Sequence, residues 1–209
     1  MKFAHEGIPF VFASGGITLL IGMMDWWWVG FAALGLTLFF AWFFRDPDRL
    51  VPEEEGAIVA PADGRVVAIE PRHSAPSWPG VVFQRVSIFM SPLDVHVNRV
   101  PASGEVVSVC HSPGRFRAAY LSAASSDNER NEIAVRDAHG HPLAFVQIAG
   151  WMARRIVCRL RPGEFVERGA RFGMILFGSR MDVYVPESAT IRVAIGDRVR
   201  GGSDVVAIL

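Results

Sequence analysis

Residues 172–186 read Phe172-Gly-Met-Ile-Leu-Phe-Gly-Ser-Arg-Met-Asp-Val-Tyr-Val-Pro186, with runs of apolar and β-branched residues on either side of Gly178-Ser179. Such runs are typical of β-strands and Gly-Ser is a common turn dipeptide, so the segment predicts two strands joined by a tight bend. A serine at that bend can face the preceding carbonyl with its hydroxyl, and attack there would turn the amide into an ester and break the chain. Most Gly-Ser pairs are plain turns, so the remaining sequence has to decide between the two interpretations.

Short β runs separated by glycine and proline continue on both sides of this segment, over residues 57–209, after a Pro-punctuated linker at 45–56. Helical patterns are scarce in this part, and only 116–124 indicates one short turn. The predicted strands are 57–60, 64–70, 81–90, 104–110, 131–136, 142–148, 155–159, 173–177, 182–185, 190–194 and 205–209.

One pattern occurs twice. Gly163-Glu-Phe-Val-Glu-Arg-Gly169 followed by Ile175, and Gly196-Asp-Arg-Val-Arg-Gly-Gly202 followed by Ile208, carry glycine, valine and isoleucine at equal offsets. Each copy predicts a tight turn, an inward valine, a second glycine turn and a strand. The pattern resembles the hammerhead-like β units of lipoyl and biotinyl carrier domains, without a carrier lysine at the turn. We therefore expect a mainly β fold, a flattened β sandwich or barrel.

The first 44 residues form a different region. Residues 8–24 and 26–44 carry no charge, and only Asp25 separates them. Spanning a bilayer takes about 20 apolar residues, with a lower limit near 17. The pattern predicts a membrane anchor over 1–44, either a helical hairpin that turns at Asp25 or two segments embedded in the interface.

Charged and aromatic residues near this region indicate its orientation. Lys2, Arg45 and Arg49 place positive charge at one end of a hairpin, which predicts the cytoplasmic side, and Trp26 to Trp28 suit the headgroup level. We expect the protein at the cell membrane, with its β domain over 57–209 on the cytoplasmic face.

Composition limits the partners. The chain has 209 residues, 51% of them hydrophobic, which is enough for one domain with a core plus a short extra element. Its net charge of zero lacks the basic excess that nucleic-acid binding requires, so we expect no nucleic acid. Cys110 and Cys158 have neither metal-ligand spacing nor a disulfide framework, so no metal site is predicted.

Arginine dominates the basic residues, since Lys2 is the only lysine among 21. A cluster of arginines between 154 and 171 predicts a solvated strand face for most of its members, with a headgroup site as the alternative. The cluster comprises Arg154, Arg155, Arg159, Arg161, Arg168 and Arg171.

Four segments together resemble the phosphatidylserine decarboxylase family, and the resemblance extends from the linker at 45 to the C-terminus. They are Pro61-Ala-Asp-Gly64, Met90-Ser-Pro-Leu-Asp-Val-His-Val-Asn-Arg-Val-Pro101, Asp127-Asn-Glu-Arg-Asn131 and Phe177-Gly-Ser-Arg-Met-Asp182. The sequence Phe-Gly-Ser-Arg is similar to the compact branch of this family, which includes forms acting on archaeal-type serine lipids.

The resemblance implies autocatalytic cleavage between Gly178 and Ser179. The products would be chains 1–178 and 179–209, held together as a heterodimer, with a pyruvoyl cofactor derived from Ser179 at the head of the small chain. It further implies that the amine of a serine phospholipid forms a Schiff base with this ketone, loses carbon dioxide and leaves as phosphatidylethanolamine.

Further roles follow from the resemblance. His96 matches the histidine linked to decarboxylation, and histidine exchanges protons near neutral pH. Asp63 matches the aspartate associated with maturation. The better-known members of the family carry a second histidine where this chain has Arg99, and arginine is a poor base. Either His96 therefore serves both steps, or Asp63 acts through water while Arg99 holds an anion. Asp94 is expected either to orient His96 or to stabilise a turn.

Arg99, Glu129, Asn131 and Arg180 are the predicted substrate-binding residues. Alternatives to phosphatidylserine decarboxylation are a decarboxylase for an archaeal-type serine ether lipid, a decarboxylase for a soluble amino acid, or a non-enzymatic membrane adaptor with a carrier-like β domain. In the adaptor, Gly178-Ser179 would be an inert turn.

Overall fold

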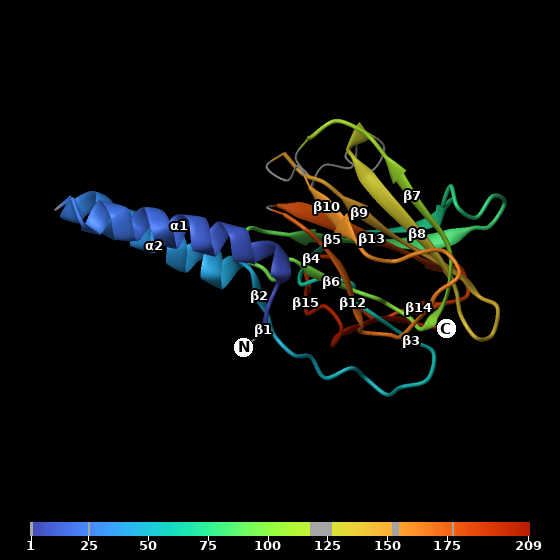
Figure 1. The fold of residues 1–209 in the computed structure, drawn as a ribbon. Helices are drawn as coiled ribbons and strands as arrows, with labels where there is room; N and C mark the ends of the chain where they lie inside the picture. The colour runs from blue at the N-terminus through green and yellow to red at the C-terminus, as the bar shows by residue number, and fades with distance from the viewer. Residues whose placement is uncertain (1, 25, 118–126, 152–154, 177) are drawn as a thin grey trace. The chain divides into compact units, whose positions relative to one another are not determined.

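A computed structural model describes residues 2–24, 26–117, 127–151, 155–176 and 178–209 (Figure 1). The chain divides into two compact units, Met1–Asp48, which is mainly helical, and Arg49–Leu209, which is built of β-strands. Asp25, Arg154, Phe177 and most of the predicted turn at 116–124 lie outside the described residues.

The N-terminal unit is a helical hairpin, as predicted. After the short 3-10 helix η1 (His5–Gly7), α1 (Ile8–Gly22) and α2 (Trp27–Phe43) lie side by side, with the hydroxyls of Thr18 and Thr37 3.1 Å apart. The two ends of the hairpin meet, because β1 (Lys2–Phe3) pairs with β2 (Arg45–Asp46). Among the residues that the structure describes, no helix has the combined length and apolar character needed to cross a membrane.

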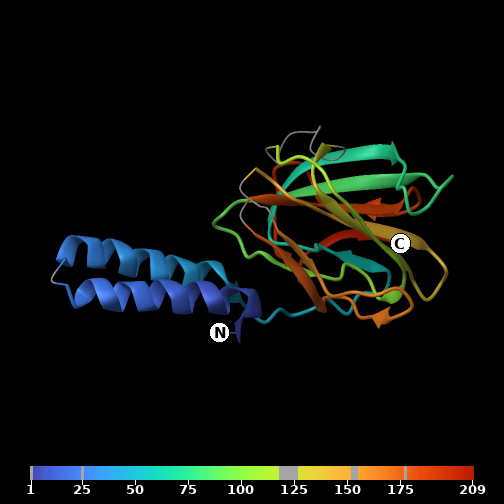
Figure 2. The same cartoon turned by 45° about the horizontal axis from the view of Figure 1, so that its top comes forward.

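The β unit contains one large sheet and two small ones. Its strands are β3 (Ala57–Val59), β4 (Gly64–His73), β5 (Phe83–Met90), β6 (Val97–Arg99), β7 (Gly104–Ser112), β8 (Arg130–Arg136), β9 (Pro142–Ile148), β10 (Ile156–Cys158), β11 (Phe165–Val166), β12 (Arg171–Ile175), β13 (Ser179–Pro186), β14 (Thr190–Ile191), β15 (Arg198–Val199) and β16 (Val205–Ile208). Eight strands form a curled sheet in the order β11-β7-β8-β9-β13-β5-β4-β15 (Figure 2). The small sheets are β10-β12-β6 and β14-β16-β3, so the mainly β prediction is confirmed.

One face of the large sheet, which we name the inner face, carries two buried apolar clusters. Side chains alternate along a strand, so Met181, Val183 and Val185 of β13 share this face. Val183 and Val185 belong to a buried cluster that includes Ile58 of β3, whereas Met181 belongs to a second cluster with β12 residues such as Phe172. One cluster lies beneath each small sheet, and a third buried cluster, which includes Phe83 and Tyr184, lies on the opposite face of the large sheet.

The repeated sequence pattern folds into two copies of one arrangement. The first half consists of β3, β4, β15 and β16, and the second half of β6, β7, β11 and β12. Val199 pairs with Gly64 at the start of β4, and Val166 pairs with Gly104 at the start of β7. Both valines are buried, as the pattern predicts.

Backbone hydrogen bonds match between the halves. At the first glycine of each pattern, the Gly196 N–H donates to the Val66 carbonyl at 2.8 Å and the Gly163 N–H to the Val106 carbonyl at 2.7 Å. At the second glycine turn, the Gly202 N–H donates to the Ala60 carbonyl and the Gly169 N–H to the Val100 carbonyl, both at 2.8 Å. The two glycine turns thus anchor a short strand to a long one in each half.

Each predicted strand has a counterpart, but the sequence predicts no strand at β6, β11 or β15. These strands are two or three residues long, too short for an alternating pattern to show. In addition, β13 begins at Ser179 rather than 182, because Ser179 and Arg180 pair with Met90 and Phe89 of β5.

Candidate active site

Ser179 is the first residue of β13, and its side chain is fully buried on the inner face. It pairs with Met90, the last residue of β5. The preceding Gly178 has a φ of 62°, a left-handed conformation that is strained for residues with a side chain. The chain therefore turns sharply at the peptide bond between these residues and enters the sheet at the serine.

The hydroxyl of Ser179 is held weakly. It donates to Sδ of Met90 across an O···S distance of 3.9 Å, and a thioether sulfur is a weak acceptor. The strand pairing fixes the serine backbone, while the hydroxyl is restrained by a weak bond. This arrangement suits a nucleophile that has to leave its resting partner.

Polar side chains continue from Met90 along the inner face. Asn98 Nδ2 lies 3.8 Å from Met90 Sδ, and Asn98 Oδ1 accepts a hydrogen bond from Gln147 Nε2 at 2.9 Å. Gln147 Oε1 accepts from Asn131 Nδ2 at 3.1 Å. All three amides are buried, and an unpaired buried amide costs about 1–3 kcal/mol, so the bonds hold one another in place. The predicted site residue Asn131 is thus connected to the surroundings of Ser179.

His96 is fully buried and directly precedes β6, two residues before Asn98. Its Nδ1 lies 2.9 Å from the backbone oxygen of Asp94. Because a carbonyl oxygen only accepts, Nδ1 carries the proton in the neutral ring and Nε2 is the basic nitrogen. His96 can therefore take up or deliver a proton at Nε2.

The Asp94 carboxylate stabilises a turn, one of the two roles predicted for it. Its Oδ2 accepts from the Ser91 N–H at 2.8 Å and from the Ser91 hydroxyl at 2.7 Å. The backbone carbonyl of Asp94, not its carboxylate, orients His96.

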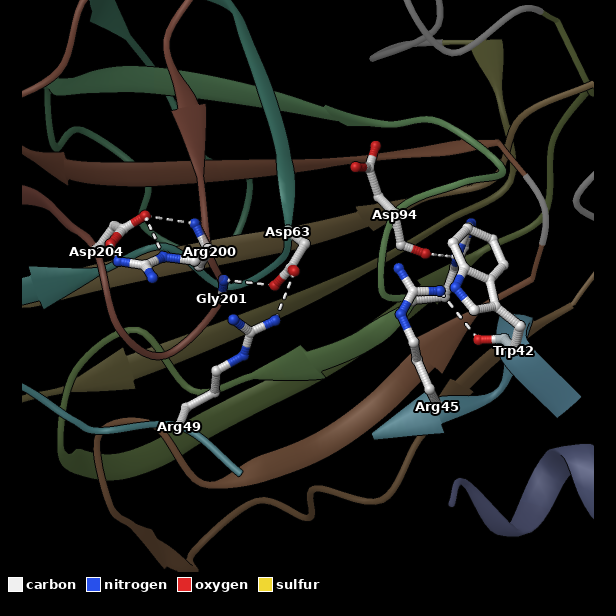
Figure 3. A network of polar contacts seen from close by, with 9 residues as sticks. Trp42, Arg45, Arg49, Asp63, Asp94, Arg200, Gly201 and Asp204 are labelled. Carbon is white, nitrogen blue, oxygen red and sulfur yellow. Dashed lines mark hydrogen bonds and ion pairs between the residues drawn. The ribbon is translucent and has the colours of Figure 1, made fainter. Parts of the chain in front are cut away.

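Asp63 lies just before β4, and both of its carboxylate oxygens are bound (Figure 3). Oδ2 accepts from Arg49 Nη2 at 2.6 Å and Oδ1 from the Gly201 N–H at 2.8 Å. Burial raises the pKa of Asp63 above the ordinary aspartate value, and the charge of Arg49 and the Gly201 hydrogen bond oppose that rise. Sequence reasoning does not identify Arg49 as a partner of Asp63.

Arg180 points away from Ser179, to the outer face of the sheet, because neighbouring residues on a strand face opposite sides. Its Nε lies 2.8 Å from Asp182 Oδ1. Arg85 Nη1 lies 3.8 Å from Asp182 Oδ2, and Arg85 also forms an ion pair with Glu70.

A cavity of about 370 Å³ lies on this outer face. It is lined by His73, Ser74, Pro76, Arg85, Arg130, Glu132, Val146, Ile148, Asp182 and Tyr184.

Arg99 and Glu129 have partners within the protein. The buried Arg99 donates from Nη1 to the Gly169 carbonyl at 3.0 Å. Glu129 Oε1 lies 3.1 Å from Nε2 of the exposed His111. Substrate binding by either residue stays a prediction.

The structure adds site residues that the sequence does not single out, namely Met90, Asn98 and Gln147. Gln147 offers a signal in retrospect, since it is the only polar residue in the apolar run 142–148 and faces inward. Of the clustered arginines, Arg168 donates to the carbonyls of Pro52, Glu54 and Ala57 and so binds the linker to the β unit. This role is neither the solvated strand face nor the headgroup site that the sequence predicts for the cluster.

The chain is similar to known proteins over nearly its full length. A family model described as phosphatidylserine decarboxylase matches residues 36–207. The chain is 48% identical over 202 residues to a phosphatidylserine decarboxylase proenzyme of Syntrophus aciditrophicus, which covers 95% of this chain and 93% of the relative. It is 47% identical over 208 residues to the proenzyme of Cereibacter sphaeroides, covering 98% and 89%, and 44% identical over 204 residues to that of Nitrosomonas europaea, covering 98% and 94%.

Proposed function

The chain belongs to the phosphatidylserine decarboxylase family, a family of enzymes, and from this premise we propose that it cleaves itself between Gly178 and Ser179 and then converts phosphatidylserine to phosphatidylethanolamine. One observation carries the proposal: Ser179 is fully buried, weakly hydrogen-bonded and placed directly after a left-handed glycine. An inert turn would not need a buried serine at the head of a central strand.

Self-cleavage uses atoms of these two residues and water. Ser179 Oγ bonds to the Gly178 carbonyl carbon as the amide C–N bond breaks, and the hydroxyl proton passes to the nitrogen. Loss of the α-proton of residue 179 then breaks its Cβ–Oγ bond, which releases the Gly178 carboxylate and leaves dehydroalanine. Water replaces the nitrogen, ammonia departs, and residue 179 becomes a pyruvoyl group.

The fold supports retention of the small chain after cleavage. Strand β13 pairs with β5 on one side and β9 on the other, while β15 pairs with β4 and β16 with β3. Chain 179–209 would therefore stay bound to chain 1–178 as a heterodimer, with residue 179 still fixed in the sheet.

The residues around Ser179 fit a pyruvoyl group at this position. That group supplies a ketone that binds the substrate amine and accepts the electron pair left by carbon dioxide. His96 is the proton carrier, because the bond to the Asp94 carbonyl leaves Nε2 as its basic atom. Asn98, Gln147 and Asn131 keep the surrounding polar groups in a fixed arrangement.

The helical hairpin suits a lipid substrate. Large apolar side chains are exposed along both helices, including Phe12 at 78%, Leu19 at 73% and Trp28 at 88% exposure. Large apolar side chains that are exposed together on one element mark a surface that contacts a membrane or a partner. We assign the hairpin to the cell membrane, with the β unit on the cytoplasmic side, in line with the positive charge of Lys2, Arg45 and Arg49.

Denaturing electrophoresis with intact-mass measurement tests the cleavage. We expect fragments 1–178 and 179–209, the small one blocked at its N-terminus and reactive with an amine plus borohydride. Ser179→Ala should give one chain of about 23.0 kDa without activity. Ser87→Ala, at another buried serine on the neighbouring strand β5, is the matched control and should cleave normally. Normal fragments from Ser179→Ala would overturn the proposal, and a single intact parent chain would favour the adaptor.

A lipid assay tests the substrate and the membrane. Purified protein should release carbon dioxide from vesicles of phosphatidylserine faster than from vesicles of an archaeal-type serine ether lipid; the reverse order would favour the alternative substrate. The protein should also sediment with the vesicles. A variant in which Phe12, Leu19 and Trp28 are all replaced by serine should no longer sediment with the vesicles. A variant with serine in place of Phe165 and Ile195, which are exposed on the β unit, should still do so.

A further inference from the structure

The Asp63 carboxylate is bound at both oxygens, and the partner on one side comes from the linker. Arg49 is the first residue of the β unit and contacts Oδ2, while the Gly201 N–H contacts Oδ1 (Figure 3). The side chains of Arg49 and Asp63 are only 13% and 16% exposed. The ion pair is therefore shielded from solvent far more than a surface pair.

The second half shows what the turn itself requires. Asp63 directly precedes Gly64, as Ser103 directly precedes Gly104. The Gly201 N–H donates to Asp63, and the Arg168 N–H, at the matching position before Gly169, donates to the Ser103 hydroxyl at 2.9 Å. A serine hydroxyl thus accepts the backbone hydrogen bond of this turn as well as a carboxylate does. The negative charge at Asp63 is an addition that the fold does not need.

Carrying that charge is unfavourable without a partner. Burial is the largest influence on Asp63 and raises its pKa, and Arg49 is the cation in contact that opposes it. Among other charged groups, Asp94 raises the pKa further, Arg200 interacts with Asp63 from the Gly201 turn, and Arg99 lies beside Gly202. A carboxylate only 16% exposed and paired with an arginine, at a place where serine would accept the same hydrogen bond, indicates a function.

The strand register places the backbone of Asp63 about two strand spacings from the bond to be cleaved. Arg65 of β4 pairs with Phe89 of β5, and Phe89 pairs with Arg180 of β13. Adjacent strands lie about 4.8 Å apart, so such a row spans about 10 Å. Asp63 is two residues before Arg65, at the end of the sheet where Ser179 begins β13.

We propose that Arg49 is a positioning residue for self-cleavage, which acts by holding the Asp63 carboxylate ionised and in one orientation near Ser179. The inference rests on the proposed cleavage at Gly178-Ser179. It assigns a role in maturation to the linker, and it explains how Asp63 is held in a chain that has Arg99 where the better-known members of the family have a histidine.

The test is the pH dependence of self-cleavage in full-length chains. Protein made by cell-free synthesis is labelled in a short pulse and diluted into buffers from pH 5 to 9. The cleaved fraction is then followed by electrophoresis. Removing Arg49 raises the pKa of Asp63, so the carboxylate forms only at higher pH. For Arg49→Gln we expect cleavage about tenfold slower near pH 6 and close to the parent rate at pH 9. Arg49→Lys should restore most of the rate at pH 6.

Two further variants separate charge from structure. Asp63→Ser copies Ser103, keeps an acceptor for the Gly201 N–H and removes the charge, so cleavage should fall at least about 100-fold at every pH. Arg200→Gln removes an exposed arginine that pairs with Asp204, and it should keep the parent profile.

Stability provides the last control. An acid whose pKa is raised by folding stabilises the fold at low pH and loses that contribution as pH rises through the folded-state pKa. Asp63→Ser alone leaves the shielded Arg49 guanidinium without this carboxylate. The double variant of Asp63→Ser with Arg49→Gln should therefore melt no lower than the parent at pH 7. A parent profile in Arg49→Gln, a slowing of equal size at all pH values, or faster cleavage would overturn the inference while leaving the proposed function intact. A parent chain that never cleaves would overturn both.

Discussion

The two halves of the β unit share a scaffold and differ at the site. Both anchor a short strand to a long one through a buried valine, Val199 on Gly64 in the first half and Val166 on Gly104 in the second. Equivalent backbone bonds form at both glycine turns. Matching geometry therefore identifies the residues that serve the fold, and positions at which the halves diverge are the candidates for chemistry.

The divergent positions coincide with the candidate active site. His96 directly precedes β6, where the first half has Gly56 before β3, and Asn98 stands in the middle of β6, where β3 has the buried Ile58. The second half therefore has polar residues at positions where the first half has small or apolar ones, and one of them, Asn98, contacts Met90, the residue that Ser179 also contacts. The first half contributes its own difference, the carboxylate of Asp63 in place of a serine hydroxyl.

The largest predicted effect tests whether the scaffolds are equivalent. A Cβ on Gly64 would lie 2.2 Å from the Phe89 carbonyl oxygen, and one on Gly104 would lie 2.3 Å from that of Arg136. Backbone atoms of a paired strand cannot easily move aside, so Gly64→Ala and Gly104→Ala should each lower the free energy of unfolding by about 3 kcal/mol.

Urea unfolding of full-length chains in a Ser179→Ala background measures this loss without interference from cleavage. Gly140→Ala is the control, since a Cβ there meets open space and the variant carries only the backbone cost of a φ of 88°, about 1 kcal/mol. If one half tolerates alanine and the other does not, the halves are not equivalent as folding units.

A smaller effect is expected at the link between the second half and the large sheet. Gln147→Leu keeps the size of the side chain but leaves the Asn98 Oδ1 and Asn131 Nδ2 without their mutual partner. We expect a loss of about 2 kcal/mol and slower cleavage, because buried amides left unpaired are costly and Asn98 lies against Met90. Unfolding and pulse-labelled cleavage measure both effects.

Gln84→Leu is the matched control for this variant. The Gln84 amide donates to two backbone carbonyls, those of Glu187 and Ala189. It is only half-buried and forms no part of the hydrogen-bonded series Asn98, Gln147 and Asn131. It should lose less stability and cleave normally. Equal cleavage rates in the two glutamine variants would show that the hydrogen bonds among Asn98, Gln147 and Asn131 have no role in cleavage.

At Gly178 the predicted cost comes from the backbone alone. Alanine would meet no atom within 4 Å there, but a φ of 62° costs a residue with a side chain about 1 kcal/mol. Gly163 in the repeated turn has a φ of 86° and equally open space, so Gly163→Ala should lose similar stability. Only Gly178→Ala should also slow cleavage, by about tenfold in the pulse-labelling assay. A cleavage defect of equal size in both would mean that lost stability, not the conformation of the scissile bond, sets the rate.

Local patterns in the sequence were sufficient for the scaffold but not for the site. Apolar runs and glycine turns predict the helical hairpin, the long strands and the repeat, because each depends on residues close together in the chain. Asn98 and Gln147 are 49 residues apart, and their contact depends on how two sheets pack. The partnership of Arg49 with Asp63 was equally hidden, since a charge in a linker has no periodic signature and its partner is chosen by the folded chain.

The smallest predicted effect reverses the difference between the halves. Ser103 is exposed, unlike Asp63, so Ser103→Asp would place a carboxylate in water while keeping an acceptor for the Arg168 N–H. An exposed substitution of this kind should change the free energy of unfolding by no more than about 0.5 kcal/mol, with no change in the pH profile of cleavage. A clear shift in that profile would show that an acid at either turn influences Ser179. The distinctive role of Asp63 would then come from charge at long range, and not from its burial against Arg49.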